Sequence, residues 1–523
     1  MVVAAALLGV VGGVILERQT ISTVGSRLGV NDKLSFTMNL IENKYVDNIA
    51  RDSLLELVVP ALINKLDPHS SYIPAAELTE KNEPLQGKFD GIGVMFNMLT
   101  DTVLVTNVIS GGPSDKAGVV AGDRIITVND SVIAGRKIPS DEVVKKLKGT
   151  RGTKVTIGVQ RNGSNELARI TITRGVIPMK SLDAAFVIAD TVGYIKFSRF
   201  AATTYKELME AMAVLTKDGA KRFVVDLRGN GGGYMEPAIL IANEFLEKGQ
   251  KIVYTEGAHS RRLDQYADGS GKYKSVPLVV MIDEGSASAS EILAGAIQDN
   301  DRGLVVGRRS FGKGLVQEQI DYPDGSALLM TIAHYYTPVG RSIQKPYKMG
   351  ESDEYFMELY QRAAHDELFS VDSIKQNEKL KFVTSKGRVV YGGGGIMPDE
   401  FVPLDTAGVN GYFRKVFAKN LIFRYATKVV EENRPAINKI DSFAALERFL
   451  ASKNLFYDFV NYASKSGVQP DRAADAEEVK SLIMGQIKGY IGRNTLLEDN
   501  ALYFYFHPVD KTAVRAVELL RKE

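Results

Sequence analysis

Between residue 192 and about residue 345, short, continuously apolar segments alternate with longer amphipathic ones. The apolar segments include GYIKF, RFVVDLR, PLVVMID and LVVG, and the amphipathic ones include YKELMEAMAVLTKDG, EPAILIANEFLEKG and SASEILAGAIQ. Apolar segments of this length are typical of strands buried on both faces, and the amphipathic segments have the spacing of helices. Strands that alternate with helices predict an α/β fold with a largely parallel sheet covered on its faces.

The rest of the chain has a different character. Residues 33–65 place apolar side chains at helical spacing. Residues 87–175 contain short β-rich runs such as TVLVTNVI and TKVTIGVQ, separated by turns, with one helical run among them. Residues 406–523 are mostly helical in pattern and carry no catalytic motif. A chain of 523 residues is expected to form about three or four domains, which agrees with this division.

The charge balance and the absence of cysteine exclude several kinds of function. Lysine and arginine together number 65 against 63 aspartates and glutamates, which gives a net charge of +2. Proteins that bind nucleic acid need an excess of cations against the phosphate backbone, so we expect no nucleic-acid partner. A chain without cysteine has no thiol nucleophile, no thiolate metal site and no disulfide.

An uninterrupted apolar run, VVAAALLGVVGGVIL, occupies residues 2–16. As a helix it would be about 22 Å long, shorter than the roughly 30 Å hydrocarbon core of a bilayer. It resembles the apolar core of a signal sequence, and the alternative is a buried helix. Because a glycine-rich run without a polar face makes a poor core helix, we interpret residues 1–18 as an export signal or membrane anchor.

Three segments with unusual composition follow predicted strands of the α/β region. They are DLRGNGGGYM (226–235), DEGSASASEI (283–292) and GRRSFGKGLVQ (307–317). In open α/β sheets, functional sites form outside the carboxyl ends of the strands. We therefore expect these three segments to meet in one site.

The third segment also fits the core of a phosphate-binding loop. Gly307, Gly312 and Lys313 satisfy the Gly-x4-Gly-Lys pattern after a strand. However, residue 314 is glycine, so the hydroxyl that would hold magnesium is absent. The sequence that follows reads as two extended segments around a YPDG turn, whereas a phosphate-binding loop leads into a helix. We therefore reject a nucleotide site.

Lys313 is instead a candidate general base for a serine nucleophile. None of the five histidines lies in a motif that pairs it with the serine-rich turn. A lysine base must be neutral, and lowering its pKa from about 10.4 to about 7 requires roughly 4–5 kcal/mol, which desolvation can supply. In an extended segment Lys313 and Gln317 face the same side, so the Gln317 amide can orient the amine.

The serine-rich turn offers Ser288 as the nucleophile, with an alternative explanation. Ser288 and Glu291 also fit the Ser-x-x-Glu pattern of a capping box, which would only start a helix. If Ser288 is the nucleophile, the N–H of Ala289 at the helix start can stabilise an oxyanion. Residues 231–233, all glycine, can supply a second donor, or they form only a tight turn.

In the β-rich region, GIGV (Gly91, Ile92, Gly93, Val94) is expected to open a strand. Glycines at this place expose backbone N–H groups that can hold the terminal carboxylate of a peptide while the strand pairs with it. The alternative is an ordinary strand start that contains glycine.

Together the motifs resemble the carboxyl-terminal processing peptidases, also called tail-specific proteases, a family of Ser–Lys enzymes. The matches occur in the family's order and cover roughly residues 66–400: LDPHSSY (66–72), FDGIGV (89–94), GGPSDKAGVVAGDRIITVN (111–129), DLRGNGGGY (226–234), GSASASEILAGAIQDN (285–300), GRRSFGKGLVQ (307–317) and YYTPVGRSIQ (335–344). The chain departs from the family at Gly229 and Gly231, where asparagine and proline are frequent; we expect only a change in loop stiffness.

The resemblance implies a role for each site residue. The second serine of GSASASE, Ser288, would be the nucleophile, Lys313 the general base and Gln317 its supporting amide. The oxyanion donors would be the N–H of Ala289 and that of either Gly232 or Gly233. The family uses no metal and no nucleotide, so no cofactor is expected.

The resemblance also implies a crotonase-like (ClpP-like) α/β protease core with an inserted PDZ domain, whose GIGV segment would receive the carboxyl terminus of a substrate. The expected divisions are an export signal or anchor (1–18), a helical amino-terminal part of the protease (19–86), the PDZ domain (87–175), the α/β core (176–405) and a helical carboxyl-terminal domain of open role (406–523).

The expected function is a serine endopeptidase that cleaves exported proteins through their accessible carboxyl-terminal tails. It would work in the bacterial periplasm, tethered to or associated with the inner membrane through residues 2–16, and a homodimer is expected from the helical end segments. The alternative is a non-catalytic scaffold that binds peptides through the PDZ domain.

Overall fold

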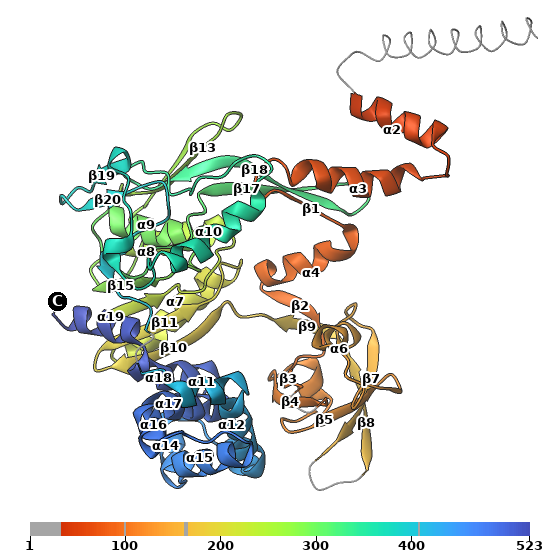
Figure 1. Cartoon of the computed structure of the whole chain (residues 1–523), viewed down its shortest axis with the longest axis vertical. Helices are drawn as coiled ribbons and strands as arrows, with labels where there is room; N and C mark the ends of the chain where they lie inside the picture. The colour runs from red at the N-terminus through yellow and green to blue at the C-terminus, as the bar shows by residue number, and fades with distance from the viewer. Residues whose placement is uncertain (1–32, 99–100, 162–165, 406–407, 523) are drawn as a thin grey trace, which may run out of the picture. The chain divides into compact units, whose positions relative to one another are not determined.

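The computed structural model describes residues 33–98, 101–161, 166–405 and 408–522 (Figure 1). The predicted export signal or anchor at residues 2–16 lies outside this part of the chain. Among the described residues, no helix has both the length and the apolar character needed to cross a bilayer. The chain forms two compact units, and the smaller one contains the described residues up to Leu78 together with Glu318–Thr331 and Tyr347–Tyr355.

The larger unit is built around a six-stranded sheet. In spatial order its strands are β10 (Leu182–Ala189), β11 (Val192–Phe197), β12 (Arg222–Asp226), β15 (Leu278–Ile282), β16 (Leu304–Gly307) and β21 (Glu400–Phe401). Neighbouring strands are parallel except for β10 and β11. The predicted α/β fold with a largely parallel sheet is confirmed.

Helices that alternate with these strands along the chain cover one face of the sheet. They are α7 (Thr204–Lys217), α8 (Met235–Phe245) and α9 (Ala289–Asp299). Side chains from alternate strand positions, such as Val225 and Val280, are fully buried beneath them. Their chain neighbours Val224 and Val279 are equally buried in a second core on the other face. This burial on both sides explains why the strands are continuously apolar.

The last helix of the chain, α19 (Lys511–Lys522), covers that second face. Ala513, Ala516, Val517 and Leu520 recur at helical spacing and pack against β12, β15 and β16. An amphipathic helix of this kind is held mainly by its buried apolar stripe. The carboxyl-terminal region thus supplies one layer of the α/β core.

The other carboxyl-terminal helices surround an apolar core of their own, which includes Val416, Phe459 and Ile487. They are α11 (Gly411–Ala418), α12 (Leu421–Glu432), α13 (Arg434–Ile437), α14 (Phe443–Ala451), α15 (Leu455–Lys465), α16 (Ala473–Glu478), α17 (Lys480–Gly492), α18 (Asp499–Phe506) and the 3-10 helix η3 (His507–Val509). The predicted helical character of this region is confirmed.

A β-rich domain is inserted between α4 (Ala75–Gln86) and β10. Its sheet and short helices are β3 (Val94–Asn97), β4 (Val103–Val108), α5 (Pro113–Lys116), β5 (Arg124–Val128), β6 (Ser131–Val132), α6 (Ser140–Leu147), β7 (Lys154–Gln160) and β8 (Leu167–Thr173). The chain enters through β2 (Lys88–Gly91) and leaves through β9 (Gly175–Pro178), and these two strands pair antiparallel. This pairing closes the insertion at its base.

The strand expected from GIGV begins later than the pattern indicated. β2 ends at Gly91 and β3 begins at Val94, so Ile92 and Gly93 form the connection between them. Gly93 has a φ of +78°, a conformation that glycine adopts without steric cost. The segment is therefore a turn that leads into an edge strand.

The extended segments predicted around the YPDG turn are β17 (Leu315–Asp321) and β18 (Ala327–Tyr336), which pair with each other. In the larger unit, β18 continues to β13 (Lys251–Glu256), which pairs with β14 (Leu263–Tyr266). This arrangement replaces the helix that a phosphate-binding loop would require.

Residues 346–390 form α10 (Ser352–Ala364), the 3-10 helices η1 (Val371–Ser373) and η2 (Glu378–Leu380), and the beginning of a hairpin, β19 (Lys381–Val383) with β20 (Val389–Tyr391). The smaller unit contains α2 (Lys33–Lys44), α3 (Arg51–Ile63) and β1 (Ser71–Ile73), which pairs with the first residues of β18. The predicted helices between residues 33 and 65 are thus present.

Candidate active site

The three segments singled out in the sequence follow β12, β15 and β16, which are neighbours in the sheet. Parallel strands end at the same edge of a sheet, so the loops that follow them converge. Gly232 of the first segment lies against Ser288 of the second. Glu291 of the second segment binds the N–H of Lys313 in the third. The three loops therefore lie together, as expected.

Ser288 lies at the turn from β15 into α9, in an unusual backbone conformation. Its φ is 56° and its ψ is −114°, whereas an ordinary N-cap residue is in the β region. A positive φ at a non-glycine residue costs free energy that the surroundings must supply, and such residues cluster at functional sites. The Tyr335 hydroxyl donates to the Ser288 carbonyl at 3.0 Å and helps to hold the turn.

The Glu291 carboxylate joins the serine turn to the lysine loop. Its Oε2 accepts hydrogen bonds from the N–H of Ser288 at 2.8 Å and from that of Lys313 at 2.9 Å. Its Oε1 accepts from the N–H of Gly312 at 2.7 Å and from the Ser310 hydroxyl at 2.5 Å. The side chain is fully buried, and burial raises the pKa of Glu291 although these donors oppose the shift.

The capping-box interpretation therefore accounts for only part of the arrangement. Glu291 does bind the N–H of Ser288, as a capping box requires. The same carboxylate also holds two backbone N–H groups of the loop that carries Lys313. Sequence reasoning missed this second role, because the motif gave Glu291 a partner within its own helix turn.

Lys313 and Gln317 lie on one side of the chain where it enters β17. Lys313 Nζ donates a hydrogen bond to Gln317 Oε1 at 2.8 Å. Lys313 is half-buried, as is Ser288. The amide is a neutral acceptor, so it orients the amine without adding a negative charge beside it.

A glycine turn, Gly229–Gly233, lies directly against the serine turn. A Cβ atom on Gly232 would lie only 2.7 Å from Ser288 Cβ and 3.1 Å from the nitrogen of Ala289. Gly232 also has a φ of +100°, so both space and backbone conformation require glycine there. The two turns are therefore in van der Waals contact.

The backbone donors near Ser288 differ in what they bind. As the first residue of α9, Ala289 has an N–H that its own helix cannot satisfy. The N–H of Gly232 donates to the Asn230 side chain at 2.9 Å, whereas that of Gly233 donates to no residue in the described part of the chain. The sequence left these two glycines as equal alternatives, and in the structure the N–H of Gly232 is the one that already has an acceptor.

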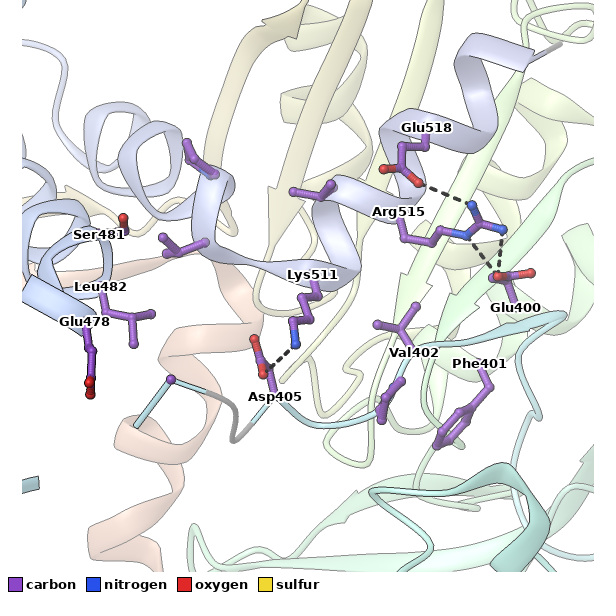
Figure 2. A pocket seen from close by; sticks show the side chains of 15 residues that line it. Glu400, Phe401, Val402, Asp405, Glu478, Ser481, Leu482, Lys511, Arg515 and Glu518 are labelled. Atoms are coloured by element: carbon purple, nitrogen blue, oxygen red, sulfur yellow. Dashed lines mark hydrogen bonds and ion pairs between the residues drawn. The ribbon is translucent and has the colours of Figure 1, made fainter. Parts of the chain in front are cut away.

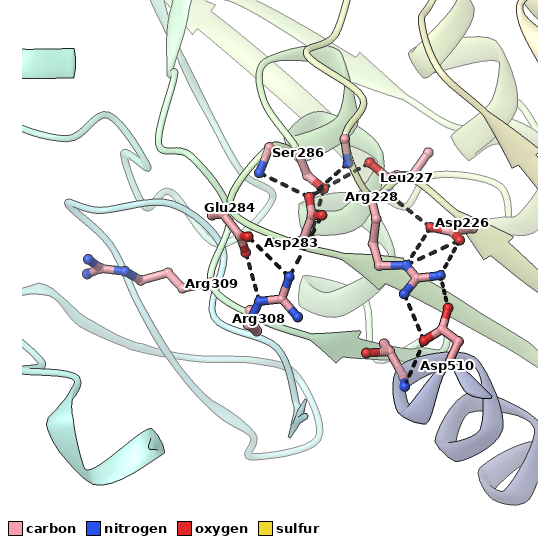
Figure 3. A network of polar contacts seen from close by, with 12 residues as sticks. Asp226, Leu227, Arg228, Asp283, Glu284, Ser286, Arg308, Arg309 and Asp510 are labelled. Carbon is pink, nitrogen blue, oxygen red and sulfur yellow. Dashed lines mark hydrogen bonds and ion pairs between the residues drawn. The ribbon is translucent and has the colours of Figure 1, made fainter. Parts of the chain in front are cut away.

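Two carboxylates hold the backbone where the chain enters the glycine turn, and Figure 3 labels both, Asp226 and Asp283. The fully buried Asp226 accepts a hydrogen bond from the backbone N–H of Arg228 at 2.9 Å. Asp283 Oδ1 accepts from the N–H of Gly229 at 2.8 Å. The sequence signal for these residues was weak: an aspartate at the end of an apolar run that predicts a strand.

In the β-rich domain, Gly91, Ile92, Gly93 and Val94 lie where the turn enters the edge strand β3. The carbonyls of Ile92 and Gly93 accept from Ser114 and Ile109, at 2.9 and 3.1 Å, which fixes the turn. An edge strand can pair with an added peptide strand.

Two cavities lie elsewhere in the larger unit. The first, of about 600 Å³, lies between β21 and the carboxyl-terminal helices (Figure 2). The second, of about 350 Å³, is lined by Arg309, Gln344 and residues 392–395, and Gln344 also accepts from the N–H of Gly314 at 2.8 Å. Within the residues that the structure describes, no group of three or more His, Cys, Asp or Glu side chains is placed to hold a metal ion.

Three parts of the chain match known family models. A family model described as peptidase family S41 matches residues 191–349, a PDZ domain model matches residues 91–172, and a family of unknown function matches residues 412–496. The carboxy-terminal processing protease CtpA of Bacillus subtilis (strain 168) is 33% identical over 63% of this chain and 70% of its own. The carboxy-terminal-processing protease of Bartonella bacilliformis (strain ATCC 35685 / KC583 / Herrer 020/F12,63) is 35% identical over 58% of this chain and 70% of its own.

A solved structure of a photosystem II D1 C-terminal processing protease is 27% identical over 60% of this chain and 85% of its own, with a TM-score of 0.36. The sequence matches define the chain as a serine-type peptidase with a PDZ domain. It belongs to peptidase family S41, the carboxy-terminal processing proteases.

Proposed function

We propose that the chain is a serine endopeptidase in which Lys313 is the general base for Ser288. The observation that carries the proposal is the Glu291 carboxylate, which binds the backbone N–H groups of both residues through one oxygen. Gln317 then orients the Lys313 amine at 2.8 Å. These contacts support the proposal, because they hold the backbones of the two residues on one carboxylate and proton transfer requires their side chains to be close.

In this mechanism the neutral Lys313 amine takes the proton of the Ser288 hydroxyl while Ser288 Oγ attacks the carbonyl carbon of the scissile peptide bond. The carbonyl oxygen becomes an oxyanion, which the N–H groups of Ala289 and the glycine turn stabilise. Within the described residues the N–H of Gly233 donates to no acceptor, so we assign the second donor to it. The intermediate collapses when the protonated lysine gives its proton to the leaving amine. Water then hydrolyses the acyl-enzyme by the same route.

The substrates are proteins with accessible, apolar carboxyl termini. The β3 edge and the Gly91–Val94 turn would bind the terminal residues, because backbone N–H groups can hold a carboxylate while the strand pairs with the peptide. We further propose that the protein is exported to the bacterial periplasm and associates with the inner membrane through residues 2–16. A homodimer belongs to the same proposal, and sedimentation velocity tests it.

The proposal is tested with an unfolded protein that carries a carboxyl-terminal tag and with a fluorophosphonate probe, which labels activated serines. We expect Ser288→Ala and Lys313→Ala to lose cleavage, and Ser288→Ala to lose labelling as well. Lys206→Ala, at an exposed lysine on α7, serves as the control and should keep both. Wild-type activity should rise with pH as the amine loses its proton.

Full cleavage by either catalytic variant contradicts the Ser–Lys mechanism. Stoichiometric binding of the tagged protein without cleavage, and without labelling of Ser288, supports the scaffold alternative instead.

A further inference from the structure

A chain of charged groups connects the glycine turn to the carboxyl-terminal helix α19 (Figure 3). Arg228 Nη2 lies 2.7 Å from Asp226 Oδ2 and 2.6 Å from Asp510 Oδ2. Arg228 Nη1 adds a second hydrogen bond to Asp510, at 3.0 Å. The Arg228 guanidinium is therefore shared between a strand end of the protease core and the residue that precedes α19.

Asp510 also caps the amino terminus of α19. Its Oδ1 accepts hydrogen bonds from the N–H groups of Thr512 at 3.0 Å and Ala513 at 3.1 Å. The first N–H groups of a helix need acceptors, and an aspartate at this position supplies them. One carboxylate thus fixes the helix start and the Arg228 side chain together.

Arg228 is in turn fixed to the glycine turn through its backbone. Its N–H donates to Asp226 at 2.9 Å, and its carbonyl accepts from Lys196 Nζ at 2.8 Å. The residue that follows is Gly229, the first of the glycine turn. A displacement of Arg228 is thus passed along a short backbone segment to Gly232, which touches Ser288.

We propose that Asp510 is a positioning residue for peptide hydrolysis, which acts through Arg228 to hold the glycine turn at the distance from Ser288 that oxyanion stabilisation requires. The proposal rests on the function proposed above. It gives the carboxyl-terminal helix, which lies beyond residues 191–349 matched by the peptidase family model, a part in forming the active site.

The expected effect is a loss of turnover with little change in substrate binding. Removal of an oxyanion donor typically lowers kcat by about 100- to 1,000-fold, and donors act mainly in the transition state. Without the Asp510 charge, Arg228 keeps its hydrogen bonds to Asp226. The glycine turn should therefore become more mobile but keep its conformation. We therefore expect a fall in kcat of about ten-fold, with KM unchanged.

The informative variant is Asp510→Asn, because asparagine is as good an N-cap as aspartate. Its amide oxygen can still accept from the start of α19, whereas the negative charge and the second acceptor for Arg228 are gone. Asp510→Ser likewise keeps the cap but is too short to reach Arg228, and it should show the same loss. Asp510→Glu, which keeps the charge, should recover part of the activity.

The matched control is Glu400→Gln. Arg515 of α19 binds Glu400 of β21 at 2.8 Å (Figure 2). This ion pair joins the same helix to the same sheet, at a strand that β15 and β16 separate from β12. Its partners are 31% and 37% exposed, compared with 19% and 26% for Arg228 and Asp510. We expect the control to keep wild-type kcat, because half-exposed ion pairs contribute little.

Two measurements separate positioning from general destabilisation. A peptide boronic acid forms a tetrahedral, negatively charged adduct with the nucleophilic serine, so its inhibition constant should rise about ten-fold in Asp510→Asn and stay constant in Glu400→Gln. Hydrogen exchange followed by mass spectrometry should be faster in residues 229–233 of Asp510→Asn than in the control. This second readout does not depend on catalysis.

Unchanged exchange in residues 229–233 overturns the proposal, whether or not the enzyme is active. So does a loss of kcat in Asp510→Asn that leaves the inhibition constant of the boronic acid at the wild-type value. Failure of the Ser–Lys mechanism is recognised separately, because Ser288→Ala would then keep its activity while the exchange experiment still reports on the contact between Asp510 and the glycine turn.

Discussion

The backbone nitrogens of Ser288 and Lys313 donate to the same carboxylate oxygen, Oε2 of Glu291, at 2.8 and 2.9 Å. The two residues are 25 positions apart in the sequence and come from loops after neighbouring strands. One buried acceptor therefore holds the backbones of the proposed nucleophile and the proposed base close together.

We expect Glu291→Gln to be nearly inactive and less stable. The amide places an NH2 group where Oε2 accepts from Ser288 and Lys313, so buried N–H groups lose their acceptor at about 1–3 kcal/mol each. Because the displaced loops carry both reacting groups, kcat should fall by about 100-fold or more. Urea unfolding and steady-state kinetics measure both effects, and Glu210→Gln, at an exposed residue, serves as the control. A Glu291→Gln variant with wild-type kcat would refute this role.

The glycine turn offers a matched pair of substitutions. Gly232→Ala places a Cβ atom 2.7 Å from Ser288 Cβ at a φ of +100°, and we expect kcat to fall by about 100-fold or more. Gly231→Ala meets nothing within 4 Å and has no positive φ, so it should keep wild-type kinetics. Equal kinetics for the two variants would show that contact between the turns does not matter for turnover.

The charged base of the turn makes stability depend on pH. Burial alone would raise the pKa of Asp226, but the charges of Arg228 and Lys196 and the hydrogen bonds to the carboxylate hold that pKa well below its ordinary value. A lowered pKa contributes stability above the unfolded value of about 3.9, and this contribution is lost as the pH falls through the folded value.

We therefore expect Asp226→Asn to lower the free energy of unfolding by about 3–5 kcal/mol at neutral pH, since it breaks a buried ion pair. The difference from wild type should shrink steadily below about pH 4. Urea titrations between pH 2 and pH 7 measure it. A difference in the free energy of unfolding that is constant over this range would contradict the assignment of Asp226 as ionised in the folded protein.

If the PDZ domain recognises carboxyl termini, two peptides of the same apolar sequence should differ in affinity when one ends in a free carboxylate and the other in an amide. The peptide with a free carboxylate should bind to the Ser288→Ala variant at least about ten-fold more tightly than the carboxyl-terminal amide, because backbone N–H groups bind an ionised acceptor more strongly. Fluorescence anisotropy gives both dissociation constants. Equal affinities would exclude the Gly91–Val94 turn as a carboxylate site.

Much of the fold follows from local sequence pattern. The apolar runs of β12, β15 and β16 predicted a parallel sheet, and the residues at their ends predicted where the loops converge. The placement of Lys313 and Gln317 on one side followed from the extended chain, and the structure shows their side chains in contact. The start of β3 was predicted too early, because the pattern does not reveal that Gly93 turns the backbone with a φ of +78°.

The sequence by itself determined the alternation of strands and helices and the identity of the residues at strand ends, because periodicity depends on neighbours a few positions apart in the chain. Only the tertiary structure decided that Glu291 joins two loops, that Gly232 rather than Gly233 donates to Asn230, and that Asp510 reaches Arg228 across 282 positions. Contacts of this kind depend on how the layers of the fold pack. The helix α19 covers the second face of the sheet because its apolar stripe packs against the strands there.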